Sequence, residues 1–226
     1  FHWFEQFNWF ITSSGLLVVG GKTADQNETI VKKYMEKNDI YVHSDVAGSG
    51  SYVIRNENNV EIKLKTLIQT GSFVVSHTKA WKSGAADKSW WVYSNQVSKT
   101  TESGEYVGKG SFIIRGKKNM MQQQKLELGI GILFKNKENN NFYIFNTTAD
   151  ATIQYAVPIV APYNGMSNYK FKIKLVPGKG KLGKTLKLIK QKFFKIGNIY
   201  EKASLRNITD TEYHKVLVSG IRVLLK

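Results

Sequence analysis

Two periodicities of apolar residues alternate along the chain and predict a mixture of strands and helices. A period of two is typical of strands with one solvated face, whereas a period near 3.6 marks amphipathic helices. The predicted strands are 9–11, 16–19, 40–44, 52–55, 90–97, 112–114, 126–134, 142–145 and 170–175. The predicted helices are 24–36, 64–81 and 183–196, the first of them capped by Thr23. Short turns between neighbouring strands favour antiparallel pairing, so we expect an α+β protein with a mainly antiparallel sheet and flanking helices.

The segment 89–119 carries the most informative pattern. Two adjacent tryptophans, Trp90 and Trp91, begin an alternating strand, and the segment ends near the basic turn Arg115-Gly116-Lys117-Lys118. Because adjacent side chains on a strand point to opposite faces, at most one of the two indoles is expected to be exposed. An exposed indole beside basic residues is suited to base stacking and phosphate contact. The alternative interpretation is two ordinary core strands joined by a polar loop.

The order of residues in this segment resembles one family. SWWVYSNQVSKT, GEY and GSFIIRGKKN, in that order, are similar to the NFACT-R domain of the NFACT family, the nuclear export mediator factor of ribosome-associated quality control. Blocks at 3–11, 18–21 and 39–43 look like earlier parts of the same domain, and blocks at 160–163 and 168–178 look like the start of the NFACT-C domain.

This resemblance implies a domain organisation. We expect an NFACT-R domain over residues 1–149 and a smaller, basic α+β NFACT-C domain over residues 150–226. Strands 126–134 and 142–145 are assigned to the first domain. Family members carry further domains before this region, so we expect the chain to be a C-terminal part of a longer protein.

The resemblance also implies a function. Family members are cytoplasmic, non-enzymatic factors, without a cofactor or bound metal, that bind the large ribosomal subunit carrying stalled peptidyl-tRNA. They support template-free C-terminal tailing of the nascent chain and recruit a Listerin-type E3 ubiquitin ligase. We expect this chain to contribute tRNA or rRNA contacts rather than tRNA selection. The oligomeric state stays open, a homo-oligomer included.

The charge distribution independently favours a polyanionic partner. The net charge of +16 is concentrated late in the chain, because residues up to Gly116 contain 13 basic and 11 acidic side chains, whereas those from Lys117 onward contain 20 and 6. Nucleic acid is the commonest such partner, with an anionic lipid surface as the alternative. Because no apolar run is long enough to span a bilayer, we expect no membrane insertion. The absence of cysteine excludes disulfides and thiol chemistry.

Basic residues after 169 form the main candidate RNA-binding set. In strand 170–175, lysines alternate with apolar residues, so one face is cationic. We predict that the strand and the following turn and helix together clasp a phosphate backbone; the alternative is a solvated lysine face. The turn GKGKLGKT matches a phosphate-loop pattern, which we interpret as a chance match because the preceding strand is half lysine. The candidates are Lys170, Lys172, Lys174, Lys179, Lys181, Lys184 and Lys187, with Arg115, Lys117 and Lys118 in the earlier turn.

The turn after strand 40–44 is the most site-like feature of the first domain. His43 and Asp45 precede a glycine-rich turn that could present free N–H groups to phosphate or ribose. Many family members have a second histidine where this chain has Ala47, which argues against two-histidine chemistry. The plainer interpretation is that Asp45 satisfies turn amides while His43 packs at a strand end. Two rival functions stay open: an RNA-processing or RNA-modifying enzyme using His43 and Asp45, and a protein-interaction module using residues 1–10.

Overall fold

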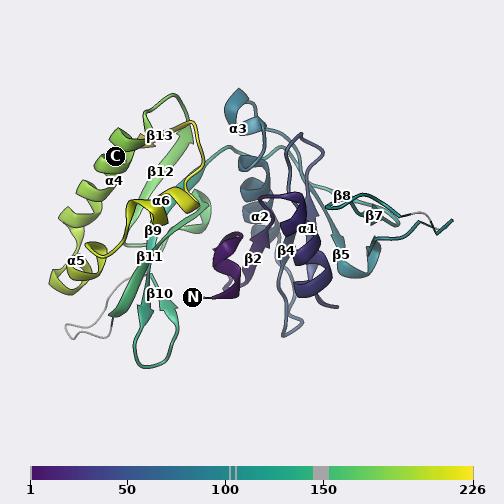
Figure 1. The fold of residues 1–226 in the computed structure, drawn as a ribbon, viewed down its shortest axis with the longest axis horizontal. Coiled ribbons are helices and arrows are strands. Elements are labelled where there is room, and N and C mark those ends of the chain that lie inside the picture. Colours follow the sequence, from purple (N-terminus) through teal and green to yellow (C-terminus); the bar gives the residue numbers. More distant parts are fainter. Residues whose placement is uncertain (1, 102, 105, 145–152, 226) are drawn as a thin grey trace. The chain divides into compact units, whose positions relative to one another are not determined.

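The structure is a computed structural model that describes residues 2–101, 103–104, 106–144 and 153–225 (Figure 1). The chain divides into two compact units, Phe1–Leu126 and Glu127–Lys226. Both units combine antiparallel sheets with helices, which confirms the predicted α+β class.

Unit 1 is built on an antiparallel sheet with the strand order β1-β2-β4-β3-β5-β8. Its strands are β1 (Asn8–Ile11), β2 (Leu17–Gly20), β3 (Ile40–His43), β4 (Tyr52–Ile54), β5 (Trp90–Tyr93) and β8 (Asn119–Met120). A separate hairpin joins β6 (Val97–Ser98) to β7 (Ile113–Ile114) and extends beyond the β5–β8 edge (Figure 1). The helices are η1 (Trp3–Gln6), α1 (Ala24–Thr29), η2 (Ile30–Tyr34), α2 (Leu64–Ser76), α3 (Ala80–Ser83) and η3 (Ser94–Gln96).

The helices of unit 1 begin as predicted but are shorter or interrupted. Thr23 caps α1, since its side-chain oxygen accepts a hydrogen bond from the Gln26 amide. The predicted helix 24–36 changes from α1 to the π-helical η2 at Ile30. The predicted helix 64–81 is two helices, because the Thr78 hydroxyl donates to the Val75 carbonyl at 2.6 Å and accepts from the Ala80 amide at 3.1 Å. This local hydrogen bonding competes with helix continuation.

Strand β5 shows the predicted alternation. Trp90 is 2% exposed and lies in a core cluster with Tyr41 and Val92, whereas Trp91 is half-buried and Tyr93 is exposed. The prediction that at most one of the adjacent tryptophans is exposed is therefore confirmed. Beyond Tyr93 the strand gives way to the 3-10 turn η3, so the predicted strand 90–97 is not continuous.

Unit 2 is a second, five-stranded antiparallel sheet centred on β9. Its strands are β9 (Leu128–Asn136), β10 (Phe142–Tyr143), β11 (Ile153–Pro162), β12 (Lys172–Pro177) and β13 (Ile221–Leu224). The helices are η4 (Tyr163–Gly165), α4 (Leu182–Ile196), α5 (Ile199–Leu205) and α6 (Asp210–Val216). Helix α4 lies along one face of the sheet (Figure 1). Its Phe193 ring packs against Phe171, with 5.8 Å between the ring centroids.

The compact units divide earlier than the domain boundary expected from the sequence. Strand β9 pairs with β11 along its whole length and also with β12, so the residues assigned to the first domain belong to the second sheet. Its buried pattern continues from Leu128 to Lys135 without alternation because both faces are covered. The expected boundary at Asp150 lies outside the described residues, whereas the two units meet between Leu126 and Glu127.

Gly131 in β9 lets the segment that precedes β12 pack closely against this strand. A Cβ atom at Gly131 would lie 2.6 Å from the Met166 side chain and 2.8 Å from the Phe171 carbonyl oxygen. Close backbone approach of this kind is a common reason for glycine inside a strand. Among the described residues, none of the helices has the length and apolar character needed to cross a membrane.

Candidate nucleic-acid interface

Three adjacent strands of unit 1 bring an aromatic ring and a lysine together at one end of the sheet. The register pairs His43 on β3 with Trp90 on β5, and Trp90 with Met120 on β8. The Lys118 Nζ atom, at the start of β8, lies 4.4 Å from the Trp90 ring centroid. The His43 ring packs edge-on against Trp90 at 5.6 Å. Trp90 is thus the centre of this cluster. The sequence did not indicate this, because the contacts depend on how β3, β5 and β8 pair.

His43 is held in a fixed orientation. Its Nδ1 atom lies 2.7 Å from the Gly50 carbonyl oxygen, which can only accept, so Nδ1 carries the hydrogen and Nε2 is the acceptor. Burial lowers the pKa of His43 and Lys118 lowers it further, while the hydrogen bond to Gly50 and the charge of Asp45 act in the opposite direction. The net shift is downward. His43 can therefore contribute a hydrogen-bond acceptor to a ligand rather than a positive charge.

Asp45 has a different partner from the one expected. Its carboxylate accepts a hydrogen bond from Trp90 Nε1 at 3.1 Å. Two amides of the turn donate to serine hydroxyls instead, and the Ser49 amide donates to the Val46 carbonyl at 3.1 Å. The Val46 amide donates to Ser44 Oγ and the Ser44 amide donates to Ser49 Oγ, each at 3.2 Å. The interpretation that Asp45 satisfies turn amides is therefore wrong. Asp45 instead fixes the indole on which Lys118 rests.

The basic turn is shaped by the β6–β7 hairpin. Gly116 has a φ of 75°, which glycine adopts without strain. Gln96 binds the main chain on both sides of Gly116. Its main-chain carbonyl accepts from the Arg115 amide at 2.8 Å, and its side-chain Nε2 donates to the carbonyls of Arg115 and Lys117. Arg115, Lys117 and Lys118 are all exposed. The turn thus presents three cations on a rigid base.

In unit 2 the lysines of the predicted cationic strand face are bound within the fold. Lys170 Nζ pairs with the fully buried Glu201 at 2.6 Å, and Lys174 Nζ pairs with Glu127 at 2.5 Å. Lys172 Nζ donates to the carbonyl oxygens of two residues in the preceding loop at 3.1 and 3.2 Å. The alternation itself is confirmed, since Phe171, Ile173 and Leu175 are buried. The charges of Lys170 and Lys174 are nevertheless paired with carboxylates, and Lys172 is hydrogen-bonded to main-chain oxygens. The three lysines therefore stabilise unit 2 and add little unpaired positive charge to its surface.

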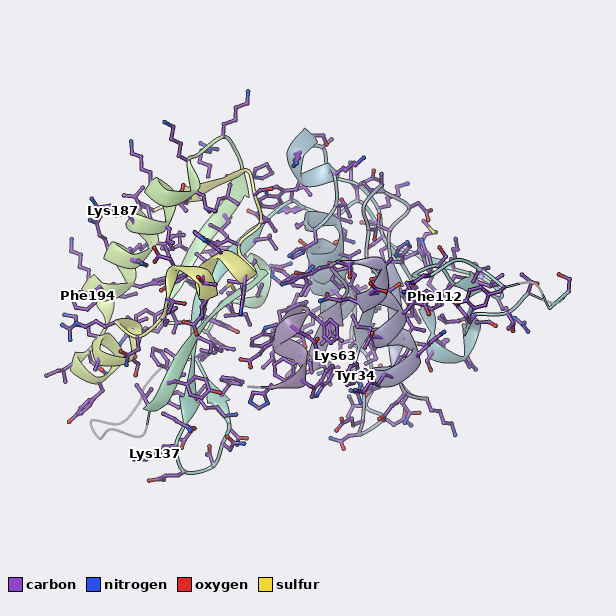
Figure 2. All side chains as sticks on the ribbon, in the orientation of Figure 1. Tyr34, Lys63, Phe112, Lys137, Lys187 and Phe194 are labelled. Atoms are coloured by element: carbon purple, nitrogen blue, oxygen red, sulfur yellow. The ribbon has the colours of Figure 1, made fainter. Side chains whose placement is uncertain are left out.

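The lysines that follow β12 are different. Lys179 and Lys181 in the connecting loop and Lys184 and Lys187 on α4 are exposed. None of the four forms an ion pair with any residue that the structure describes. Figure 2 shows Lys187 on the side of α4 that faces away from the sheet. We name this set the α4 lysine strip.

The phosphate-loop pattern in this loop has the wrong topology for a nucleotide site. Strand β12 is antiparallel to both β9 and β13, whereas a phosphate loop follows a strand of a parallel sheet. The interpretation of the motif as a chance match is consistent with this pairing. In the described part of the chain, histidine and acidic side chains nowhere gather in the threes that would hold a metal ion.

Comparison with known proteins gives matches over most of the chain. Residues 6–116 match the family described as NFACT protein RNA binding domain, and residues 135–223 match NFACT protein C-terminal domain. The chain is 50% identical over 133 residues to the Drosophila melanogaster protein named ribosome quality control complex subunit NEMF homolog, covering 59% of this chain and 13% of that protein.

Two further relatives give the same picture. The human ribosome quality control complex subunit NEMF is 45% identical over 138 residues, which cover 61% of this chain and 13% of that protein. The archaeal Rqc2 homolog aRqcH of Methanocaldococcus jannaschii is 43% identical over 132 residues, covering 58% of this chain and 19% of that protein. The chain therefore matches less than a fifth of the length of these relatives.

Proposed function

The chain belongs to the NFACT family, with its RNA-binding domain followed by its C-terminal domain, and from this premise we propose that it supplies RNA contacts of a ribosome quality control factor on the large ribosomal subunit. The relatives described above are named as ribosome quality control subunits. The observation that carries the proposal is the α4 lysine strip, whose charges are exposed and lack acidic partners in the described part of the chain.

Electrostatics make RNA phosphate a suitable partner for this strip. Residues 127–226 contain 17 lysines and arginines against 6 acidic residues. The positive end of the α4 dipole lies beside Lys181 and Lys184 and adds to their potential. Unit 1 offers a second contact through the turn that carries Arg115, Lys117 and Lys118. Phosphate contacts of this type position an RNA without reading its sequence.

The geometry of His43 and Asp45 supports binding rather than catalysis. Both side chains hold the turn and the Trp90 indole in place, through the Gly50 carbonyl and the indole N–H. A general base has to reach its substrate proton with an accessible lone pair and a suitable pKa. The burial that lowers the pKa of His43 and the absence of a second histidine at Ala47 favour a positioning role. We therefore assign no catalytic residue.

The finer steps of the family's function are part of the same proposal. On a large subunit carrying stalled peptidyl-tRNA in the cytosol, the factor would support template-free tailing of the nascent chain and recruitment of a Listerin-type ubiquitin ligase. The relatives' names as quality control subunits support this role. A homo-oligomer is compatible with it.

Salt-dependent RNA binding tests the proposal. Binding of the chain to tRNA and to rRNA fragments is measured by filter binding over a salt series, with the four residues of the α4 lysine strip changed to glutamine. If each lysine contacts one phosphate, the slope of log K against log salt is expected to fall by roughly 3. Lys63, Lys65, Lys79 and Lys82, which are exposed on unit 1, provide a control with the same charge change. An equal effect of both quadruple variants, or a flat salt response of the unmodified chain, would contradict the proposal.

A further inference from the structure

A cavity of about 600 Å³ lies within unit 2. It is near the C-terminal end of α4, whereas the α4 lysine strip lies at the N-terminal end of that helix and in the loop before it. It is open to solvent on one side and is lined by the last turns of α4, by α5 with the turn that follows it, and by α6. Its floor is apolar, since Phe193, Leu205 and Tyr213 are buried there. The volume lies within the range of small-ligand sites. No pattern in the sequence indicates this cavity, because its wall comes from three helices that are separated along the chain.

Positively charged side chains surround this apolar floor. Lys195, Lys202 and Arg206 line the cavity, and none forms an ion pair with a described residue. The Arg206 guanidinium lies 4.9 Å from the ring centroid of Phe194, and Lys202 Nζ lies 5.3 Å from it. Phe194 is half-buried and lies near the end of α4 beside α5 (Figure 2). The cavity therefore combines an aromatic wall with three uncompensated cations.

The acidic groups near the cavity are already bound within the fold. Asp210 forms an ion pair with Lys190, and Glu212 caps α6 by accepting from the Thr209 amide at 2.7 Å. Glu201 is fully buried and accepts from Lys170 and from the Asn198 amide. A ligand that enters the cavity thus meets positive charge that no neighbouring carboxylate offsets.

The geometry points to a binding site for an unstacked nucleotide of single-stranded RNA. Its base would stack on the Phe194 ring in the place where the Arg206 guanidinium now lies, while Arg206, Lys195 and Lys202 contact the flanking phosphates. Aromatic rings and arginine planes are the usual stacking surfaces for splayed bases. A peptide that binds by strand addition does not fit, because the helical walls offer no strand edge. An apolar helix in the groove would leave the charges of Lys195, Lys202 and Arg206 without partners, whereas the phosphates of RNA supply them. The inference rests on the proposed RNA contact and narrows it to unpaired nucleotides in this cavity.

A fluorescent base analogue tests this assignment. The full chain is titrated with a single-stranded oligoribonucleotide containing 2-aminopurine and, separately, with an RNA duplex of equal length. Stacking is expected to quench the 2-aminopurine. Phe194→Ala should weaken single-strand binding by about 5- to 100-fold, as expected for loss of one base–aromatic stack, and duplex binding by less than 2-fold. Phe194→Trp should keep both the quench and the affinity. Leu188→Ala, an exposed α4 residue outside the cavity, is the matched control.

The outcomes separate this site from the general RNA contact. Quenching that is lost in Phe194→Ala and kept in Phe194→Trp would support the site. If Phe194→Ala, with an unchanged melting temperature, binds single strands as the unmodified chain does, the site is refuted even when glutamines in the α4 lysine strip still abolish RNA binding. Equal weakening of single strands and duplexes also refutes it. If the unmodified chain binds neither RNA, both proposals fail. Saturable binding of an acidic amphipathic peptide that is lost in Phe194→Ala would then assign the cavity to a protein.

Discussion

Replacing Glu28 with glutamine is expected to loosen the segment that supports the β6–β7 hairpin. The buried Glu28 carboxylate, at the end of α1, forms ion pairs with Lys99 and with Lys32, the latter at 3.0 Å, and accepts from the Gly110 amide at 2.7 Å. Lys99 Nζ also donates to the Gly108 carbonyl at 2.6 Å. A neutral amide would leave both ammonium groups without their countercharge. The hairpin would then hold the basic turn less firmly.

The size of the effect follows from the ionisation of Glu28. Burial raises the pKa of its carboxyl, but hydrogen bonds from Lys99, Gly110 and Lys32 outweigh burial and lower that pKa from 4.5 to about 2. A depressed carboxyl pKa contributes stability above the unfolded-state pKa, and that stability is lost as the pH falls from about 4.5 toward 2. The shift corresponds to at most about 3 kcal/mol, and solvent screening at the exposed Lys32 reduces the expected value to about 1–3 kcal/mol.

Urea unfolding at pH 7 and at low pH measures this contribution. At pH 7 Glu28→Gln should lower the free energy of unfolding by about 1–3 kcal/mol and speed hydrogen exchange of the Gly110 amide. Near pH 2 the variant and the unmodified chain should converge. Asp25→Asn removes an exposed ion pair with Lys109 and should cost less than about 1 kcal/mol. Unchanged exchange at Gly110, or a stability difference that does not shrink with falling pH, would refute this reasoning.

Two further predictions concern the sheets of the two units. Gly131→Ala should lower the free energy of unfolding in urea by about 1–3 kcal/mol, because the added Cβ would meet the Phe171 carbonyl. Gly183→Ala is the control, because a Cβ at that position on α4 lies in open space. Equal stability of the two variants would contradict the expected clash. Asp45→Asn keeps an oxygen for Trp90 Nε1 but removes a negative charge beside Lys118, so RNA affinity in filter binding should stay equal or rise by less than about fivefold. A tenfold loss of affinity would instead indicate that the carboxylate contacts RNA.

Features set by local sequence were predictable, and features set by long-range pairing were not. The Thr23 cap and helix α4 depend on residues a few positions apart. The cap is present as predicted, and α4 forms where the sequence predicts a helix and buries Leu186, Ile189 and Phe193. The partners of Lys170 and Lys174 are on other elements, Glu201 on α5 and Glu127 next to β9, so their pairing could not be read from the strand that carries the lysines. The family resemblance assigned β9 to the first domain from its position along the chain. In the structure β9 belongs to the second sheet, because its hydrogen-bonded neighbours are β11 and β12.

The candidate RNA-binding site shows the same division. Exposure of the basic turn and of the α4 lysine strip was predictable because glycine-containing turns and lysine-rich helix faces lie at the surface. The link between Asp45 and Trp90 joins positions 45 residues apart through the β3–β5 register, which no periodicity specifies. For the residues that line the helical cavity, the sequence indicated only an excess of lysine and did not indicate that they lie together.

The internal pairing of Lys170 and Lys174 has a consequence for how a polyanion meets this protein. An isoelectric point near 9.8 suggests attraction from every direction. Part of that formal charge is already matched inside unit 2, so the remaining attraction is confined to bounded areas of its surface. A large polyanion approaching such a surface is oriented before contact is made, because only some approach directions lower its energy. The carboxylates that bind lysines within the fold therefore help to orient the protein on a polyanion as well as to stabilise it.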